Sequence, residues 1–105
     1  MASPSQMPKT VKIGAHTYNI LRKPASILED NLGHCDSNAL QIWVRARLRK
    51  SKAQEILLHE ILHAIILQSL MGEEKYDDEE FIVATAPVLL QVLQENPELL
   101  TFLAR

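Results

Sequence analysis

Residues 51–70 read SKAQEILLHEILHAIILQSL, and this stretch decides the fold. Most of its positions are apolar, and a helix that is apolar on every side is normally buried. Ser51 and Gln54 fit a capping box, in which each side chain satisfies a free backbone amide of the first turn. We therefore predict a buried helix from Ser51 to about Met71, where Gly72 ends it.

His59, Glu60 and His63 form one polar patch on this apolar helix. Positions 59 and 63 are one turn apart on the same face, so two imidazoles there can bind one zinc ion. Glu60 lies about 100° round the helix, within reach of a water whose pKa that zinc would lower. We predict that His59 and His63 are zinc ligands and that Glu60 is the general base, which later returns the proton to the leaving amine. A structural histidine pair is the alternative.

A catalytic zinc site needs a third protein ligand and one open position for water. No histidine closely follows His63, so the acidic start of a second predicted helix, residues 79–94, is the nearest source. Glu79 lies one turn before Ile82, at the edge of the apolar face of that helix, and is the preferred ligand. Glu80 is the second choice. For both glutamates the alternative is a solvated carboxylate that the helix dipole stabilises.

Three other stretches show the alternation of apolar and polar residues that is typical of strands. They are residues 11–21, 34–36 and 39–44. Gly14 and Ala15 fit a hairpin turn within the first stretch. Residues 25–33 are predicted to be irregular, and residues 1–10 to be a flexible arm.

The end of the chain predicts a kinked second helix and a short third one. Pro87 lies inside the second helix, where proline removes a hydrogen bond and kinks or breaks the helix. Asn96 and Pro97 fit a cap and a first helical position, which predicts a last helix to about Leu103. Residues 11–105 are thus predicted to form one α+β domain, with a small, mainly antiparallel sheet packed on the HEILH helix.

Length and composition exclude several classes of protein. A chain of 105 residues suffices for one modest core, and its net charge of −2 predicts no nucleic-acid partner. No apolar run approaches the roughly 20 residues that span a bilayer, so no membrane partner is expected. The single cysteine, Cys35, cannot form an internal disulfide, which favours a reducing, cytoplasmic location. The oligomeric state stays open.

The run SKAQEILLHEILHAI, followed by an acidic loop, a helix and ENPELL, resembles a family of very small phage-borne and bacterial zincins. These are similar to the minigluzincins and to the catalytic domain of ImmA/IrrE-type metallopeptidases. The similarity covers roughly residues 34–100 and is strongest at HEILHAI. It implies a zinc metallo-endopeptidase that acts on a peptide or protein, with a glutamate ligand from the second helix. In that family a polar residue often follows the ligand glutamate by four positions, whereas Val83 stands there here.

The resemblance also implies an edge strand beside the cleft that pairs with an extended peptide, here residues 39–44 or 34–36. Related minimal enzymes suggest that the tail, residues 95–105, lies over the cleft. Tyr76 is a candidate for stabilising the oxyanion, with a loop anchor as the alternative.

Two further readings compete with the zinc peptidase. A metal-stabilised interaction module, weakly active or inactive on the same scaffold, is the main alternative function. His34, Cys35 and Asp36 together suggest a thiol triad, although nothing in the sequence places a base against the thiol. Trp43 is predicted either to cover the second face of the sheet or to contact a partner.

Overall fold

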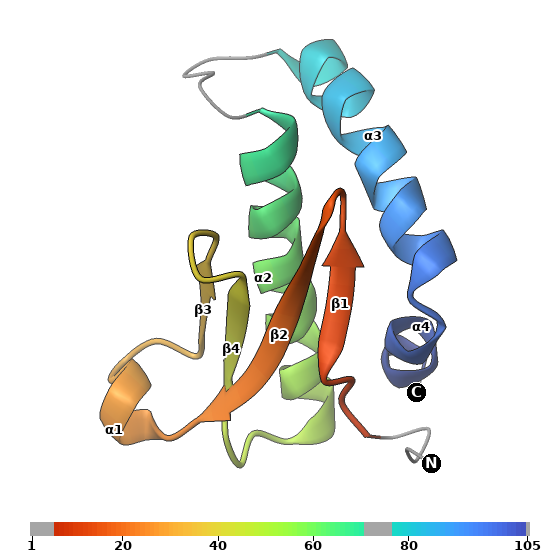
Figure 1. Ribbon diagram of the computed structural model, residues 1–105. Helices are drawn as coiled ribbons and strands as arrows, with labels where there is room; N and C mark the ends of the chain where they lie inside the picture. Colours follow the sequence, from red (N-terminus) through yellow and green to blue (C-terminus); the bar gives the residue numbers. More distant parts are fainter. Residues whose placement is uncertain (1–5, 71–76, 105) are drawn as a thin grey trace.

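The computed structural model describes residues 6–70 and 77–104, and it confirms the α+β class (Figure 1). These residues form four strands and four helices. They are β1 (Thr10–Ile13), β2 (His16–Lys23), α1 (Ala25–Leu28), β3 (Gly33–Asp36), β4 (Gln41–Arg45), α2 (Lys50–Ser69), α3 (Asp78–Glu95) and α4 (Pro97–Leu103).

The four strands form one mixed sheet in the order β1-β2-β4-β3. β1 and β2 are an antiparallel hairpin in which Ile13 faces His16, so the predicted turn at Gly14 and Ala15 is confirmed. Gly14 has a φ of 61°, which glycine adopts without strain and which suits a tight two-residue turn. β3 and β4 are also antiparallel, whereas β2 and β4 are parallel. Two of the three pairings thus agree with the predicted, mainly antiparallel sheet, and the central pairing makes the sheet mixed.

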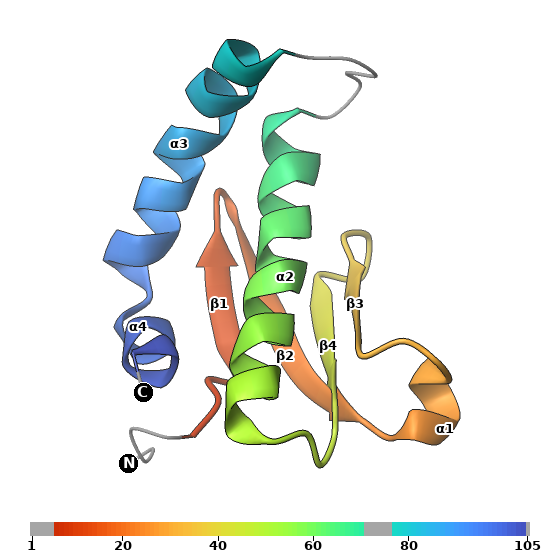
Figure 2. The same cartoon turned by 180° about the vertical axis from the view of Figure 1, so that it is seen from behind.

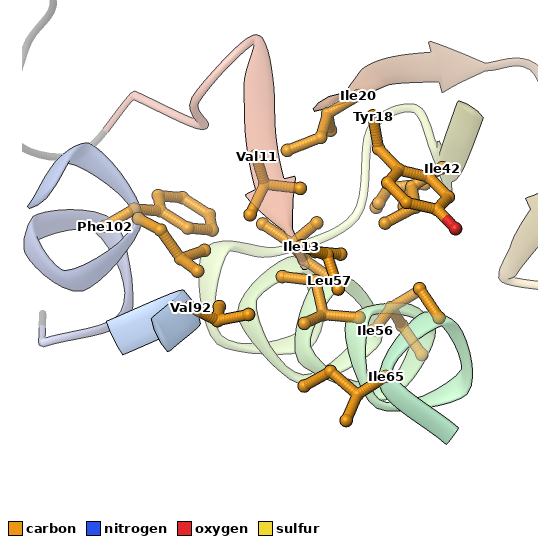
Figure 3. Packing of buried hydrophobic residues seen from close by; sticks show 14 of the residues in the cluster. Val11, Ile13, Tyr18, Ile20, Ile42, Ile56, Leu57, Ile65, Val92 and Phe102 are labelled. Atoms are coloured by element: carbon orange, nitrogen blue, oxygen red, sulfur yellow. The ribbon is translucent and has the colours of Figure 1, made fainter. Parts of the chain in front are cut away.

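One face of the sheet packs against α2, while α3 and α4 close the side next to β1 (Figures 1 and 2). Both layers supply the fully buried side chains, several of which are shown in Figure 3. The largest of them are Val11, Ile13, Tyr18, Ile42, Val44, Leu57, Ile61, Ile65, Val92 and Leu99. Burying one large apolar side chain stabilises a fold by roughly 1.5–3 kcal/mol, so this core holds α2 firmly against the strands.

The boundaries of the first two helices differ from those predicted. α1 forms within residues 25–33, a stretch predicted to be irregular, and it is only one turn long. α2 begins at Lys50 after Arg49, and no side chain caps it, so the predicted Ser51–Gln54 capping box is wrong. Extended backbone at Arg49 sets the start instead. The predicted stop at Gly72 lies outside the described residues.

α3 begins with a capping box between Asp77 and Glu80, which was not predicted from the sequence. The Glu80 N–H donates to Asp77 Oδ1 over 2.8 Å, and the Asp77 N–H donates to Glu80 Oε2 over 3.3 Å. The helix then runs through Pro87 without interruption, so of the two predicted effects of this proline, a kink or a break, the break does not occur. Proline frees the carbonyl of Val83, and Val83 is 64% exposed, so water can satisfy that group.

Side chains of α3 and its C-terminal cap close the outer edge of β1. Asn96 accepts a hydrogen bond from the Lys12 N–H and donates one to the Lys12 carbonyl, both over 2.8 Å. Gln91 accepts a hydrogen bond from the Gly14 N–H over 2.7 Å. An edge strand with unpaired backbone groups is a template for another chain. At the β1 edge the backbone groups of Lys12 and the Gly14 N–H are satisfied, whereas β3 lies at the opposite edge of the sheet.

Candidate functional site

The HEILH run occupies the middle of α2, and its two histidines point toward each other. The Nε2 atoms of His59 and His63 are 3.1 Å apart, and the rings meet edge to face at 4.8 Å. Two nitrogens bound to one tetrahedral zinc, with bonds of about 2.0–2.1 Å, lie roughly 3.3 Å apart. The pair therefore has nearly the separation that zinc requires, although a hydrogen bond between two neutral imidazoles gives a similar distance.

Glu60 lies beside the histidines but, unlike them, is buried. Only 7% of its surface is exposed, and its Oε2 atom is 4.0 Å from His59 Nε2. The helix explains this contrast, since Glu60 is rotated by about 100° from His59, toward the sheet. Burial of a carboxylate lowers the stability of the fold unless the carboxylate binds a partner. Such a group beside two accessible imidazoles is therefore a candidate for a part in a reaction.

These three residues open onto one cleft of about 410 Å³ between α2 and the β3 side of the sheet. Its walls include both elements and the loop before β3. The lining residues are Asn31, Gly33, His34, Cys35, His59, Glu60, His63 and Leu67. Asn31, Gly33 and Leu67 were not predicted as site residues. Of the three, only Gly33 has a feature in the sequence that could have indicated it, as a glycine beside a predicted strand.

Gly33 leaves room for the Glu60 carboxylate. A Cβ atom at position 33 would lie 2.9 Å from Glu60 Oε2, 2.7 Å from Ile56 Cγ2 and 3.0 Å from the carbonyl oxygen of Trp43. Ile56 belongs to the packed core side of α2, and the Trp43 carbonyl belongs to the backbone of β4, so neither group can easily move aside. The close packing of β3 against α2 thus depends on the missing side chain.

We expect Gly33→Ala to lower the free energy of unfolding by about 1–3 kcal/mol, because the added methyl group overpacks the contact between β3 and α2. Urea unfolding of the metal-free protein measures this. Ser37→Ala, in the exposed turn after β3, is the control and is expected to change stability by less than about 0.5 kcal/mol. Equal stability of Gly33→Ala and the wild type would contradict the close packing.

The backbone of β3 offers hydrogen-bonding groups to the cleft. The Arg45 N–H donates to the Leu32 carbonyl over 2.8 Å, and Gly33 stands opposite Val44 in the register. Residues of an antiparallel ladder alternate between bonding to the neighbour and pointing away from it. Gly33 and Cys35 therefore direct their N–H and C=O groups away from β4, on the side where they line the cleft.

The third ligand predicted at Glu79 is not brought into the cleft. Glu79 lies exposed in the first turn of α3, and Glu80 uses its carboxylate in the capping box with Asp77. Among residues 6–70 and 77–104, no group of three or more histidine, cysteine, aspartate or glutamate side chains is arranged to hold a metal ion. The described residues thus supply two of the three protein ligands that a catalytic zinc site needs, His59 and His63. The predicted oxyanion residue, Tyr76, lies outside the described residues.

Cys35 is held as a neutral thiol. Burial raises its pKa to about 11, and the negative charges of Glu60 and Asp36 add to the shift. His34 lies on the other face of β3, where its ring packs 5.1 Å from that of Trp43. The thiolate is the nucleophilic form of cysteine, so these surroundings do not favour the thiol-triad alternative.

Because the pKa of Cys35 is raised, alkylation of this thiol by iodoacetamide is expected to be slow at neutral pH and to accelerate with rising pH toward about 11. The alkylation rate of a free cysteine would be half-maximal near pH 8.5, at its ordinary pKa. Mass spectrometry of the alkylated protein measures the rate, and Cys35→Ser gives the background. A plateau near pH 7 would indicate an activated thiolate and revive the triad.

The C-terminal segment does not lie over the cleft. Leu99 and Phe102 of α4 are buried in the core, and the Phe102 carbonyl accepts a hydrogen bond from Gln54 over 2.7 Å. Gln54 lies near the start of α2, away from the histidine pair. No residue of 95–104 lines the cleft. The prediction of a blocking tail is therefore wrong for these residues.

Comparison with known proteins does not assign the chain to a family. No protein-family model matches it, no curated protein matches it, and no solved structure matches it. In the part of the chain that the structure describes, no helix is both long enough and apolar enough to cross a membrane. The residues and geometry of the cleft are therefore the basis for a functional proposal.

Proposed function

We propose that this chain is a small zinc-dependent peptidase whose reaction takes place in the cleft between α2 and β3. The observation that carries the proposal is the pair of Nε2 atoms 3.1 Å apart, beside a buried carboxylate, in a cleft bordered by a sheet edge. His59 and His63 would hold the zinc, and Glu79 remains the proposed third ligand. When bound, zinc supplies a Lewis acid that polarises a carbonyl and acidifies water.

Glu60 is the proposed general base. Its carboxylate faces the cleft beside His59, and little bulk water reaches it. In this position it accepts a proton from the attacking water and passes that proton to the amine that leaves when the peptide bond breaks. The buried surroundings favour such proton transfer because few competing water molecules solvate the carboxylate.

The proposed substrate is an extended peptide that adds to the free edge of β3. The outward N–H and C=O groups of Gly33 and Cys35 can bond to a substrate backbone, which would place its carbonyl groups beside the histidine pair. β4 lies between β2 and β3, so residues 39–44 do not form the edge, and the alternative edge strand, residues 34–36, does. Because Asn96 and Gln91 occupy the β1 edge, β3 is the edge available for pairing.

A second candidate function is a metal-stabilised interaction module with little or no catalysis. The position of Glu79 favours it, since a site with only two protein ligands holds zinc less firmly than one with three. In that case β3 would bind a partner strand without cleaving it.

The experiment that separates the two functions is incubation of the zinc-loaded protein with a mixed peptide library, followed by mass spectrometry of the products. A peptidase yields new peptide ends that a chelator prevents, and Glu60→Gln yields none. Zinc-dependent retention of peptides without new ends would support the interaction module instead.

A further inference from the structure

The cleft is polar at one end and apolar at the other. At the polar end Asn31 lies in the loop before β3, and Glu60 lies next to Gly33. At the other end the walls are Cys35, on β3, and Leu67, on α2. Among the described residues that line the cleft, Leu67 is the only one with an aliphatic side chain. The cleft therefore offers apolar contact mainly at this second end.

The spacing along α2 places Leu67 level with the end of β3. Ile56 and Glu60 both lie against Gly33, at the start of β3. Leu67 follows Glu60 by seven residues, so it shares their side of the helix and lies about 10 Å further along it. β3 and α2 lie side by side with their axes running the same way in Figure 2, and three residue steps of a strand also span about 10 Å. A helical side chain leans toward the helix N-terminus, so Leu67 reaches back toward Cys35.

Leu67 is uncovered, although its neighbours on this side of α2 are buried. Ile56 is 8% exposed and Glu60 is 7% exposed, whereas Leu67 is 42% exposed. A peptide strand added at the β3 edge would bring a side chain to this place. Residues that stand opposite each other on neighbouring strands direct their side chains to the same face of the sheet, so the substrate residue opposite Cys35 would stand over Leu67.

We propose that Leu67 selects the substrate, and that the peptide carries a large apolar side chain at the position opposite Cys35. This inference rests on the proposed peptidase function and names the class of substrate for it. An apolar side chain at that position removes the exposed surface of Leu67 from water, whereas a charged one loses hydration there without gaining a partner. Cys35 adds to the selection, because a thiol behaves as a small apolar group.

The selected residue stands at a fixed distance from the bond that is cut. Gly33 lies against Glu60, so the substrate residue opposite Gly33 is the one closest to the proposed general base. The substrate positions opposite Gly33 and Cys35 are two residues apart, because Gly33 and Cys35 share a face of β3. We therefore expect the apolar residue within about three positions of the cleaved bond, always on the same side of it.

Cleavage of a mixed peptide library by the zinc-loaded protein tests this selection, with mass spectrometry of the products. At one position near the new peptide end, the products of the wild type should be enriched in leucine, isoleucine, methionine or phenylalanine. Leu67→Asn should abolish this enrichment and lower kcat/KM for a selected peptide by about tenfold. Wild-type cleavage without an apolar preference at any position would overturn the inference and leave the peptidase proposal standing. Absence of cleavage by the wild type would overturn the peptidase proposal and the inference with it.

The same helix offers a matched control. Leu62 is 42% exposed, the same as Leu67, but it does not line the cleft. Leu62→Asn should therefore leave both kcat/KM and the preferred residue unchanged. An equal loss in the two variants would indicate a general effect on the fold and would overturn the inference. Circular dichroism shows whether each variant is folded.

A change of preference provides a test that a loss of stability cannot imitate. Leu67→Arg places a positive charge at the apolar end of the cleft. The same substrate position should then favour aspartate and glutamate over apolar residues by about two- to fivefold, the range expected for an exposed ion pair. An unchanged apolar preference in Leu67→Arg would overturn the inference.

Discussion

Wild-type protein, loaded with zinc and then dialysed, is expected to retain close to one zinc ion per chain, whereas His59→Ala retains almost none. Removing one of two imidazoles whose Nε2 atoms are 3.1 Å apart leaves a single nitrogen on α2. Zinc affinity should fall by more than about 100-fold, the upper range seen when only a supporting residue of a metal site is lost. Elemental analysis of the two proteins gives the stoichiometry, and competition with a chromophoric chelator gives the affinities.

His16→Ala is the matched control for this loss. His16 is exposed at the start of β2 and does not line the cleft, so its removal should leave zinc binding unchanged. Equal zinc retention by the wild type and His59→Ala would show that the two imidazoles only hydrogen-bond to each other.

Zinc should also raise the melting temperature of the wild type but not that of His59→Ala, because a ligand stabilises only the state that binds it.

The long helix and its histidine pair are predictable from sequence because both depend on local spacing. The apolar run predicts a long helix, and positions 59 and 63 share a face in any α-helix. The predicted burial on every side is wrong, because Leu58 and Leu62 are exposed on the side of α2 turned away from the sheet and Leu67 is exposed in the cleft. The hairpin is predictable for the same reason, since Gly14 supplies the turn and alternation supplies the strands. The start of α2 was misplaced because the capping pattern at Ser51 does not form: Arg49, with extended backbone, precedes the helix, and Ser51 already lies inside it.

Contacts between distant segments explain what the sequence did not reveal. The parallel pairing of β2 with β4 joins strands separated by α1 and β3, and no local pattern specifies it. Gly33 matters because its Cα faces Glu60, a residue far along the chain, and only the packed structure shows this approach. Glu79 was chosen from the periodicity of α3, which defines a face of the helix but not the distance of that face from α2.

Glu60→Gln is expected to keep zinc and to lose peptide cleavage, and this pair of outcomes has the greatest power to decide the function. The amide has almost the same volume as the carboxylate, so the buried position next to Gly33 is still filled. It cannot accept the proton of the attacking water, and cleavage should fall by about 10²–10⁴-fold. Zinc affinity should change little, because Glu60 is not one of the proposed ligands. Rates come from single-turnover cleavage of a library-selected peptide.

Glu55→Gln supplies the matched control, since the same exchange is made on the same helix at a carboxylate that is 66% exposed and pairs with Lys52. We expect this variant to cleave at nearly the wild-type rate. If Glu60→Gln and Glu55→Gln cleave equally well, Glu60 is not the general base, and its buried carboxylate has only a structural role. If the wild type binds zinc but neither it nor the variants cleave any peptide, the interaction module is the better account. The same cleft would then hold a partner strand at β3, and zinc would serve to fix α2 rather than to activate water.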